Sequence, residues 1–228
     1  MAARDDWRRV RAIARKDLTT ELRAKAGFNG VVSLAVTILV LLGLSLGPDG
    51  EALRNAAVGA VWLATLFSGV IAFNRSFQVE LEGGALEPLL LYPGPRWTIF
   101  AGKLVANLVF VSLMVAVVMA VGIVLFGITV PNRWLALIGV TALGVVGLVV
   151  LGTFYASMSS RSRAREVLLP LLLFPMLVPV LLAATSASKA LLGADLMQES
   201  GAWVRLLIGY DLVFLIATFI AFEHVIES

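Results

Sequence analysis

The sequence predicts an all-α polytopic membrane protein with six transmembrane helices, and three observations carry this prediction. Of its 228 residues, 60% are hydrophobic and only 14% are charged, against about 45–50% and about 25% in soluble domains. The apolar residues fall into runs long enough to cross a hydrocarbon layer of about 30 Å as helices. Arginine and lysine gather between alternate runs. The whole chain, residues 1–228, is therefore expected to form a single membrane domain.

The first 25 residues are expected to form a basic cytoplasmic arm. They hold eight arginines or lysines and four aspartates or glutamates. Between the arginines, apolar side chains recur at spacings of three and four: Trp7, Val10, Ala14, Leu18 and Leu22. This spacing favours an amphipathic helix lying on a membrane surface, and a merely charged topology anchor is the alternative. Either form belongs at the anionic cytoplasmic leaflet.

Six apolar runs define the expected membrane spans. They cover approximately residues 26–48, 55–74, 104–130, 134–158, 167–188 and 203–222. The sixth run carries Arg205 near its outer end and contains an aspartate, Asp211, in its interior. A central aspartate costs about 2.5–3.5 kcal/mol on insertion, and the aliphatic and phenylalanine residues of this run contribute about 0.3–0.6 kcal/mol each. The summed contribution of these apolar residues matches or exceeds the cost of inserting the aspartate. In the fourth run, Gly152 and Ala156 are spaced for close packing against another helix.

The distribution of positive charge predicts the orientation of the spans. With the amino terminus inside, the arm, the second loop and the loop after the fourth span place 14 arginines and lysines on the inner side, and four lie outside. Cytoplasmic segments of membrane proteins carry an excess of these residues. Both termini are therefore expected in the cytoplasm.

Two features inside the expected spans are candidates for an intramembrane function. Asp211 is expected to face protein or a water-filled cavity, either as a hydrogen-bond acceptor between helices or as part of a pathway. Pro170, Pro175 and Pro179 interrupt the fifth span and predict a kinked or partly unwound helix. A fixed bend for packing and a moving gate are the two interpretations of these prolines.

The sequence contains no recognisable set of catalytic residues. Cysteine is absent, and the single histidine, His224, stands near the cytoplasmic end of the last span. The dipeptide Gly102-Lys103 is followed by leucine and lacks the first glycine of a phosphate-binding loop. We therefore expect a non-catalytic membrane subunit that does not itself hydrolyse nucleotide.

The second cytoplasmic loop, residues 75–103, mixes polar and apolar residues between two full spans. Three of its leucines share one side of a short helix that begins after two glycines and ends at a Tyr-Pro-Gly-Pro turn. Glutamates flank these leucines, and acidic residues are poorly suited to an anionic leaflet. We therefore favour docking on a cytoplasmic protein over a lipid-facing helix. The expected docking residues are Glu82, Leu86, Glu87, Leu89 and Leu90.

The same loop carries a resemblance to a known family. The pattern ExEGGALEPLLLxP, followed by RWTIFAGK at the start of a span, resembles the cytoplasmic coupling loop of ABC-2-type exporter permeases. Across its length the chain is similar to the haem exporter B family, the CcmB-type permeases of cytochrome c maturation. The segments that carry this similarity are ARKDLTTELR, FNRSF, SRAREVLLPLLLFPMLVPVL, YDLVF and FEHVIE, at residues 14–23, 73–77, 162–181, 210–214 and 222–227.

The resemblance implies an ABC-2-like permease of the bacterial inner membrane with a cytoplasmic coupling helix. It implies two permease copies with two ATPase subunits that hold the ATP, a haem-handling membrane partner and a periplasmic haem chaperone. ATP hydrolysis would drive either haem export or release of the loaded chaperone, so haem is expected as a handled ligand. No cofactor or metal ligand is assigned on this chain, and no nucleic acid partner is expected. The alternatives are an exporter of another amphipathic substrate and a membrane scaffold that recruits partners without transport.

Overall fold

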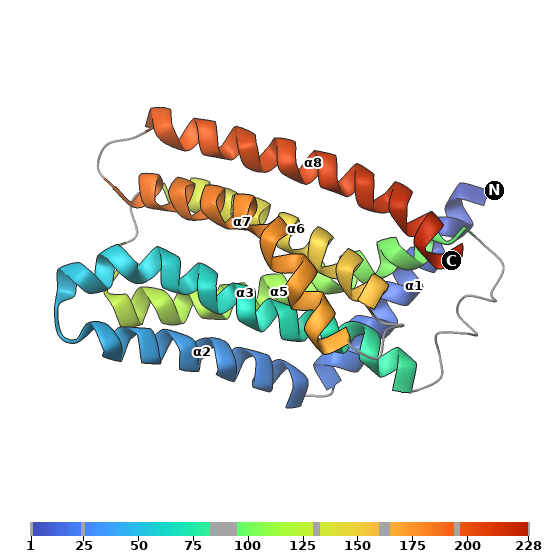
Figure 1. The fold of residues 1–228 in the computed structure, drawn as a ribbon, viewed down its shortest axis with the longest axis horizontal. Helices are drawn as coiled ribbons and strands as arrows, with labels where there is room; N and C mark the ends of the chain where they lie inside the picture. Colours follow the sequence, from blue (N-terminus) through green and yellow to red (C-terminus); the bar gives the residue numbers. More distant parts are fainter. Residues whose placement is uncertain are drawn as a thin grey trace.

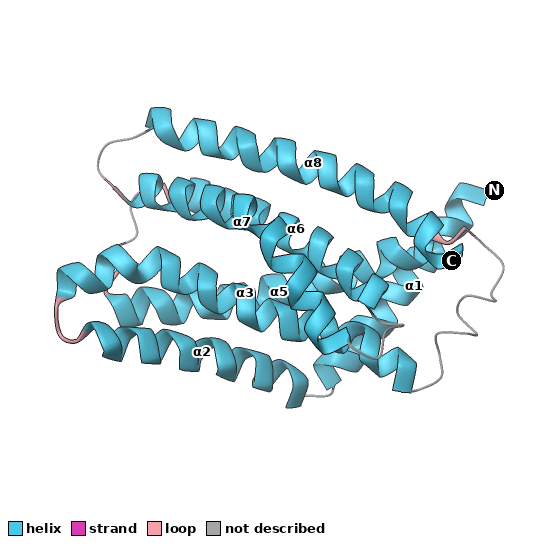
Figure 2. Ribbon diagram, viewed as in Figure 1, coloured by secondary structure: helices cyan, strands magenta, loops and turns pink. Residues whose placement is uncertain are grey.

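The computed structural model of the chain describes residues 2–23, 26–82, 95–129, 133–159, 165–193 and 197–227. In these residues every regular element is an α-helix, as Figure 2 shows. The helices are α1 (Ala2–Arg23), α2 (Ala26–Leu46), α3 (Gly50–Glu82), α5 (Trp97–Phe126), α6 (Trp134–Ser159), α7 (Arg165–Leu192) and α8 (Met197–Glu227). The predicted all-α class is confirmed.

Six of these helices are long and apolar enough to cross a membrane by length and composition. They run along a common long axis, and α1 lies at one end of this bundle together with both chain termini (Figure 1). The candidate spans are Gly27–Leu46, Gly50–Gln78, Trp97–Phe126, Trp134–Ser159, Val167–Leu192 and Ser200–Phe222. The predicted number of six spans is therefore confirmed over the part of the chain that the structure describes.

The helices around the loop predicted to be cytoplasmic, residues 75–103, extend beyond the apolar runs. Helix α3 continues as far as Glu82, and α5 begins at Trp97. Much of the loop expected over residues 75–103 is therefore helical, and Lys103 lies within α5. Hydropathy marks the part of a helix at hydrocarbon depth, whereas the backbone continues into the polar boundary, where long cationic side chains are tolerated.

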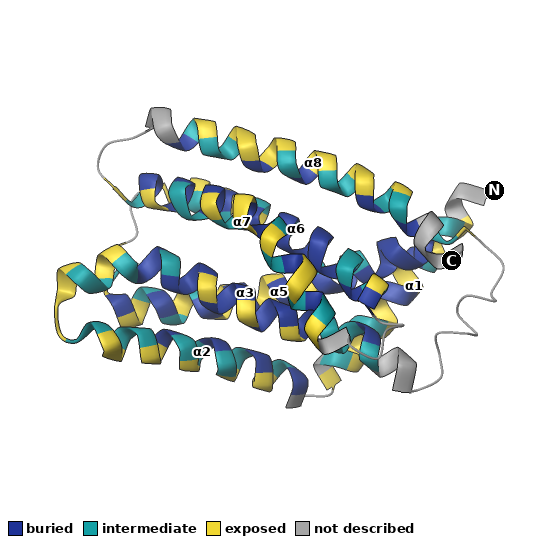
Figure 3. Cartoon of the chain, in the orientation of Figure 1, coloured by how far each residue is buried: buried dark blue, intermediate teal, exposed yellow. Residues whose placement is uncertain are grey.

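The interior of the bundle lies mainly among α3, α5 and α6, where buried residues are concentrated (Figure 3). Phe73 of α3 and Leu148 of α6 are fully buried there. A Cβ atom on Gly152 would overlap the ring of Phe73, so the glycine makes room for this side chain. The outer faces of α2 and α8 instead expose large apolar residues such as Leu44 and Ile216. Such faces match the lipid-facing side of a membrane bundle.

Helix α1 is amphipathic, but part of its apolar face contacts protein. Val10 and Ile13 are buried, and a Cβ atom on Gly102 of α5 would overlap the side chain of Ile13. Trp7, one turn earlier, is 66% exposed. The regular spacing in the arm therefore reflects contact with α5 as well as a surface position.

Helix α7 contains all three prolines and remains helical throughout Arg165–Leu192. Figure 1 shows that it bends midway along its length. The tyrosine hydroxyl of Tyr210 in α8 donates a hydrogen bond to the carbonyl of Met176, between Pro175 and Pro179. The helix is thus kinked rather than unwound, and α8 supplies a donor beside the proline-containing turn, as is usual for prolines in membrane helices.

Candidate functional site

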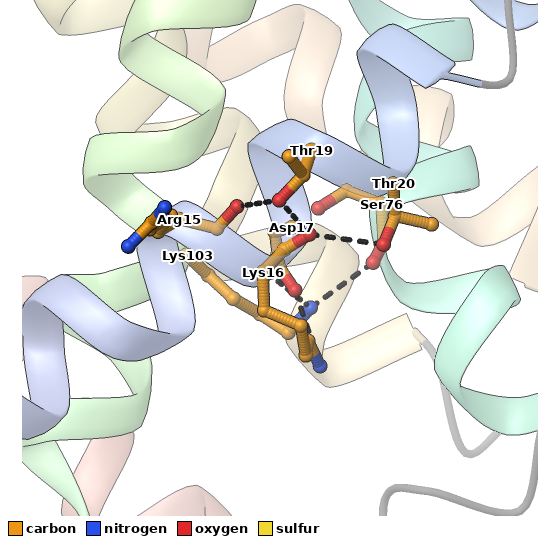
Figure 4. Close-up of polar contacts among 7 residues, drawn as sticks. All are labelled: Arg15, Lys16, Asp17, Thr19, Thr20, Ser76 and Lys103. Carbon is orange, nitrogen blue, oxygen red and sulfur yellow. Dashed lines mark hydrogen bonds and ion pairs between the residues drawn. The ribbon is translucent and has the colours of Figure 1, made fainter.

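A buried lysine forms the centre of a polar junction between α1, α3 and α5. The Lys103 side chain is 1% exposed, and its Nζ lies 3.3 Å from Asp17 Oδ2 of α1. The same ammonium donates to the backbone carbonyl of Ser76 in α3 at 3.0 Å and lies 4.4 Å from the centre of the Phe77 ring. Figure 4 shows Lys103 reaching from α5 toward Asp17 and Ser76. One side chain therefore connects three helices.

A second ion pair joins α1 to α3 beside this lysine. Arg75 Nε donates to Glu21 Oε2 at 3.2 Å. A Cβ atom on Gly27 would overlap the guanidinium, so the start of α2 also needs a glycine for this contact. Burial raises the pKa of the Glu21 carboxyl, and the lowering effect of Arg75 offsets this only in part. Desolvation of this carboxyl thus outweighs the effect of Arg75 on its pKa, and the pair joins α1 to α3.

The polar junction is defined here as Asp17, Glu21, Arg75, Ser76 and Lys103. Its α3 and α5 residues stand on either side of residues 83–94 in the sequence. Its α3 residues stand one to two turns before the end of that helix, and Lys103 stands in the second turn of α5. Ser76 takes part through its backbone carbonyl, and among the described residues no three His, Cys, Asp or Glu side chains gather as a metal site. The ion pairs and this hydrogen bond join α1, α3 and α5.

The residues predicted to dock on a partner fall almost wholly outside the described residues. Leu86, Glu87, Leu89 and Leu90 lie between residues 83 and 94, which the structure does not describe. Glu82 is the last residue of α3, and its side chain is likewise not described. The docking assignment therefore stays a prediction.

Asp211 lies in the bundle on α8 and is 6% exposed. A Cβ atom on Gly147 of α6 would come within 2.7 Å of Asp211 Oδ1, so the carboxylate fits against this glycine. Neither of its oxygens has a hydrogen-bond partner among the described residues. This contrasts with the buried Asn107, whose Nδ2 donates to Thr153 Oγ1 at 2.9 Å between α5 and α6. The carboxylate thus faces protein, with its two acceptors unused.

Sequence reasoning missed the polar junction because its partners are far apart along the chain. Hydropathy places Lys103 in a loop, and the charge distribution identifies Asp17 only as one of the charges of the arm. One signal was present: Asp17 and Glu21 are four residues apart and follow Ala14 on the same helical face. Carboxylates on that face indicate contact with cationic protein groups rather than with anionic lipid.

The bundle of six apolar helices, with an amphipathic helix fixed across one end, defines a multi-pass α-helical membrane protein. Sequence comparison then assigns the family. The model of the family described as "CcmB protein" matches residues 8–228, and the chain belongs to this family.

Curated relatives share moderate identity over most of the chain. The chain is 31% identical over 174 residues to heme exporter protein B of Rhodobacter capsulatus, covering 76% of this chain and 79% of that protein. It is 30% identical over 190 residues to heme exporter protein B of Paracoccus denitrificans, covering 82% and 86%. The protein of the same name from Haemophilus influenzae is 29% identical over 178 residues, covering 78% and 80%.

Proposed function

We propose that this chain is the permease subunit of an ABC-type complex in c-type cytochrome biogenesis at the bacterial inner membrane. A separate ATPase subunit hydrolyses ATP, and the permease couples hydrolysis to haem export or to release of a haem-loaded periplasmic chaperone. The observation that carries the proposal is the family match over residues 8–228. The name shared by the relatives, heme exporter protein B, supplies the cargo.

The polar junction supports a coupling role for the end of the bundle that carries α1. Asp17 holds Lys103 of α5, and Glu21 holds Arg75 of α3. A partner that displaces residues 83–94 would pull on the two helices that flank them, and both helices are tied to α1. Energetic coupling between distant sites needs packed and hydrogen-bonded groups of this kind.

The proposed complex contains two permease copies and two ATPase subunits, with a haem-handling membrane partner and the periplasmic chaperone. ATP belongs to the ATPase, and haem is handled by the complex rather than held as a resident cofactor of this chain. Membrane lipid is the remaining contact, at the exposed apolar faces of α2 and α8.

The docking prediction gives the sharpest test of the proposed function. Burial of a leucine contributes about 1.5–3 kcal/mol, so Leu89→Asp should weaken ATPase association by well over tenfold. The measurement is ATPase recovery with the purified permease, together with the yield of c-type cytochromes in cells whose own permease gene is deleted. Leu89→Met keeps an apolar side chain of similar size and should retain both readouts.

Each result of this experiment has a defined meaning. Membrane levels of Leu89→Asp should match wild type, because the substitution lies outside every candidate span. Undiminished ATPase recovery would refute the docking assignment and favour a lipid-facing loop. Normal c-type cytochromes in the deletion strain without any permease would refute the proposed function itself.

The orientation of the chain is a second testable part of the proposal. Reporter fusions after Asn132 and within residues 191–201 should report the periplasmic side, and fusions after Gly84 and Ser162 the cytoplasmic side. The reason is the distribution of 14 inner and four outer arginines and lysines. A periplasmic signal at Gly84 would overturn this orientation and place α1 outside.

A further inference from the structure

A cavity of about 400 Å³ lies between α3, α5 and α7 at the end of the bundle opposite α1 and the termini (Figure 1). Its polar lining comes from three segments that are distant in sequence. Arg54 and Asn55 belong to α3, Thr129 follows the end of α5, and Lys189 belongs to the last turn of α7. In the proposed orientation this is the periplasmic end. Two cationic side chains therefore line one hollow at the outer surface.

Neither cation of this cavity is neutralised within the described chain. No carboxylate there forms an ion pair with Arg54 or Lys189, whereas Lys103 and Arg75 at the other end are both paired. Arg54 lies near the beginning of α3, a helix end that favours negative charge. The dipole of α3 therefore does not stabilise the positive charge of this guanidinium. An anion between the two side chains would satisfy both.

An apolar pocket adjoins this cavity on its inner side. The two pockets share Val58, Ile128 and Leu192. Trp62 and Met119 line the deeper one. Ser188 also lines the deeper pocket, is 2% exposed, and its Oγ has no hydrogen-bond partner among the described residues. A buried hydroxyl without a partner is costly unless a ligand or water supplies one. The deeper pocket holds about 30 Å³, so it admits only the narrow edge of a ligand whose body stays in the larger cavity.

We propose that this cavity binds an amphipathic anion. A carboxylate or phosphate lies between Arg54 and Lys189, and an apolar portion extends past Val58 toward Trp62 and the Ser188 hydroxyl. Arginine and lysine form strong charge-assisted hydrogen bonds with such groups, and apolar walls with a few polar groups are usual in ligand sites. The anion comes either from a membrane phospholipid or from a transported carboxylate. Only the second source rests on the proposed function.

Binding of a porphyrin dicarboxylate tests the transported-carboxylate source. Full-length chain in nanodiscs of zwitterionic lipid is titrated with protoporphyrin IX or its uncharged dimethyl ester, and quenching of tryptophan fluorescence reports binding. Because it loses two charge-assisted hydrogen bonds, the Arg54→Gln/Lys189→Gln double variant should bind the free acid at least about tenfold more weakly. The ester should bind wild type and variant equally.

Retention of anionic lipid tests the other source in the same variants. Native mass spectrometry of chain purified with phosphatidylglycerol should show lipid retained by wild type and lost from Arg54→Gln/Lys189→Gln. The matched control is Arg133→Gln/Arg205→Gln, which removes the same charge from exposed arginines that do not line the cavity. The Arg54→Lys/Lys189→Arg variant keeps both charges and should restore binding.

The outcomes distinguish the two sources of the anion, and they can also refute the proposed anion site. Porphyrin binding that depends on Arg54 and Lys189 identifies a carboxylate ligand, and lipid retention that depends on them identifies a phospholipid. The proposal is overturned if neither anion responds to the double variant, or if the Arg133→Gln/Arg205→Gln control weakens binding as much. These results are independent of ATPase recovery with Leu89→Asp, which tests the other end of the molecule.

Discussion

Asp17→Ala is expected to lower the free energy of unfolding by about 3–5 kcal/mol, the usual effect of removing one partner of a buried ion pair. Asp17 lies 3.3 Å from the ammonium of Lys103, whose side chain is 1% exposed. Without this carboxylate the buried cation still contacts the Ser76 carbonyl and the Phe77 ring, but it loses the negative charge that lies 3.3 Å from its Nζ. For a chain of this size the melting temperature should fall by roughly 10 °C.

Thermal unfolding of the purified chain in detergent measures this effect, and α1 supplies a matched control. Asp5 pairs with Arg8 at 3.5 Å, but their side chains are 67% and 81% exposed. Exposed pairs contribute less than about 1 kcal/mol, so Asp5→Ala should leave the melting temperature nearly unchanged. Equal losses from Asp5→Ala and Asp17→Ala would refute a special role for the buried pair.

A double variant separates the electrostatic effect from loss of packing. Asp17→Ala/Lys103→Met also removes the buried cation and keeps an apolar stem, so it should recover much of the stability lost in Asp17→Ala. It should still impair cytochrome c maturation, because α1 is no longer tied to α5. Failure to recover stability would show that the contact of α1 with α5, and not the charge on Lys103, sets the cost.

The six spans could be predicted from the sequence because burial in hydrocarbon demands continuous apolar runs, a strictly local signal. The ends of the helices could not be predicted from these apolar runs. The run that begins at residue 104 lies within a helix that begins at Trp97, because helical hydrogen bonding continues past the apolar core. Likewise, the spacing of Gly152 and Ala156 predicts a close approach of helices, whereas the structure places the Phe73 ring against Gly152.

The charged sites depended on contacts that the sequence does not encode locally. Asp17 and Lys103 are 86 positions apart. Arg54 and Lys189 line one cavity only because the beginning of α3 and the end of α7 both border it. Counting these residues by side of the membrane gave an orientation without revealing their partners. Asp211 could be singled out, since one carboxylate in an apolar run is conspicuous, but its position against Gly147 required the fold.

Asp211→Leu is expected to remove most of the activity in cytochrome c maturation while leaving the fold intact. Both carboxylate oxygens are buried without a hydrogen-bond partner among the described residues, which costs about 1–3 kcal/mol for a polar group. Leucine removes that cost, so the melting temperature should stay the same or rise. A carboxylate retained at membrane depth despite this cost is expected to serve a ligand, a proton or a neighbouring subunit.

The yield of c-type cytochromes in the deletion strain, read beside the melting temperature, decides this prediction. Phe214→Leu, one turn further along α8, changes an apolar side chain at similar depth and should retain activity.

Asp211→Asn keeps the size and one acceptor of the native residue. If it restores activity, hydrogen bonding suffices; if it fails as Asp211→Leu does, the ionisable group is required. Full activity of Asp211→Leu would refute the prediction, because an unpartnered buried carboxylate would then have no function to offset its cost.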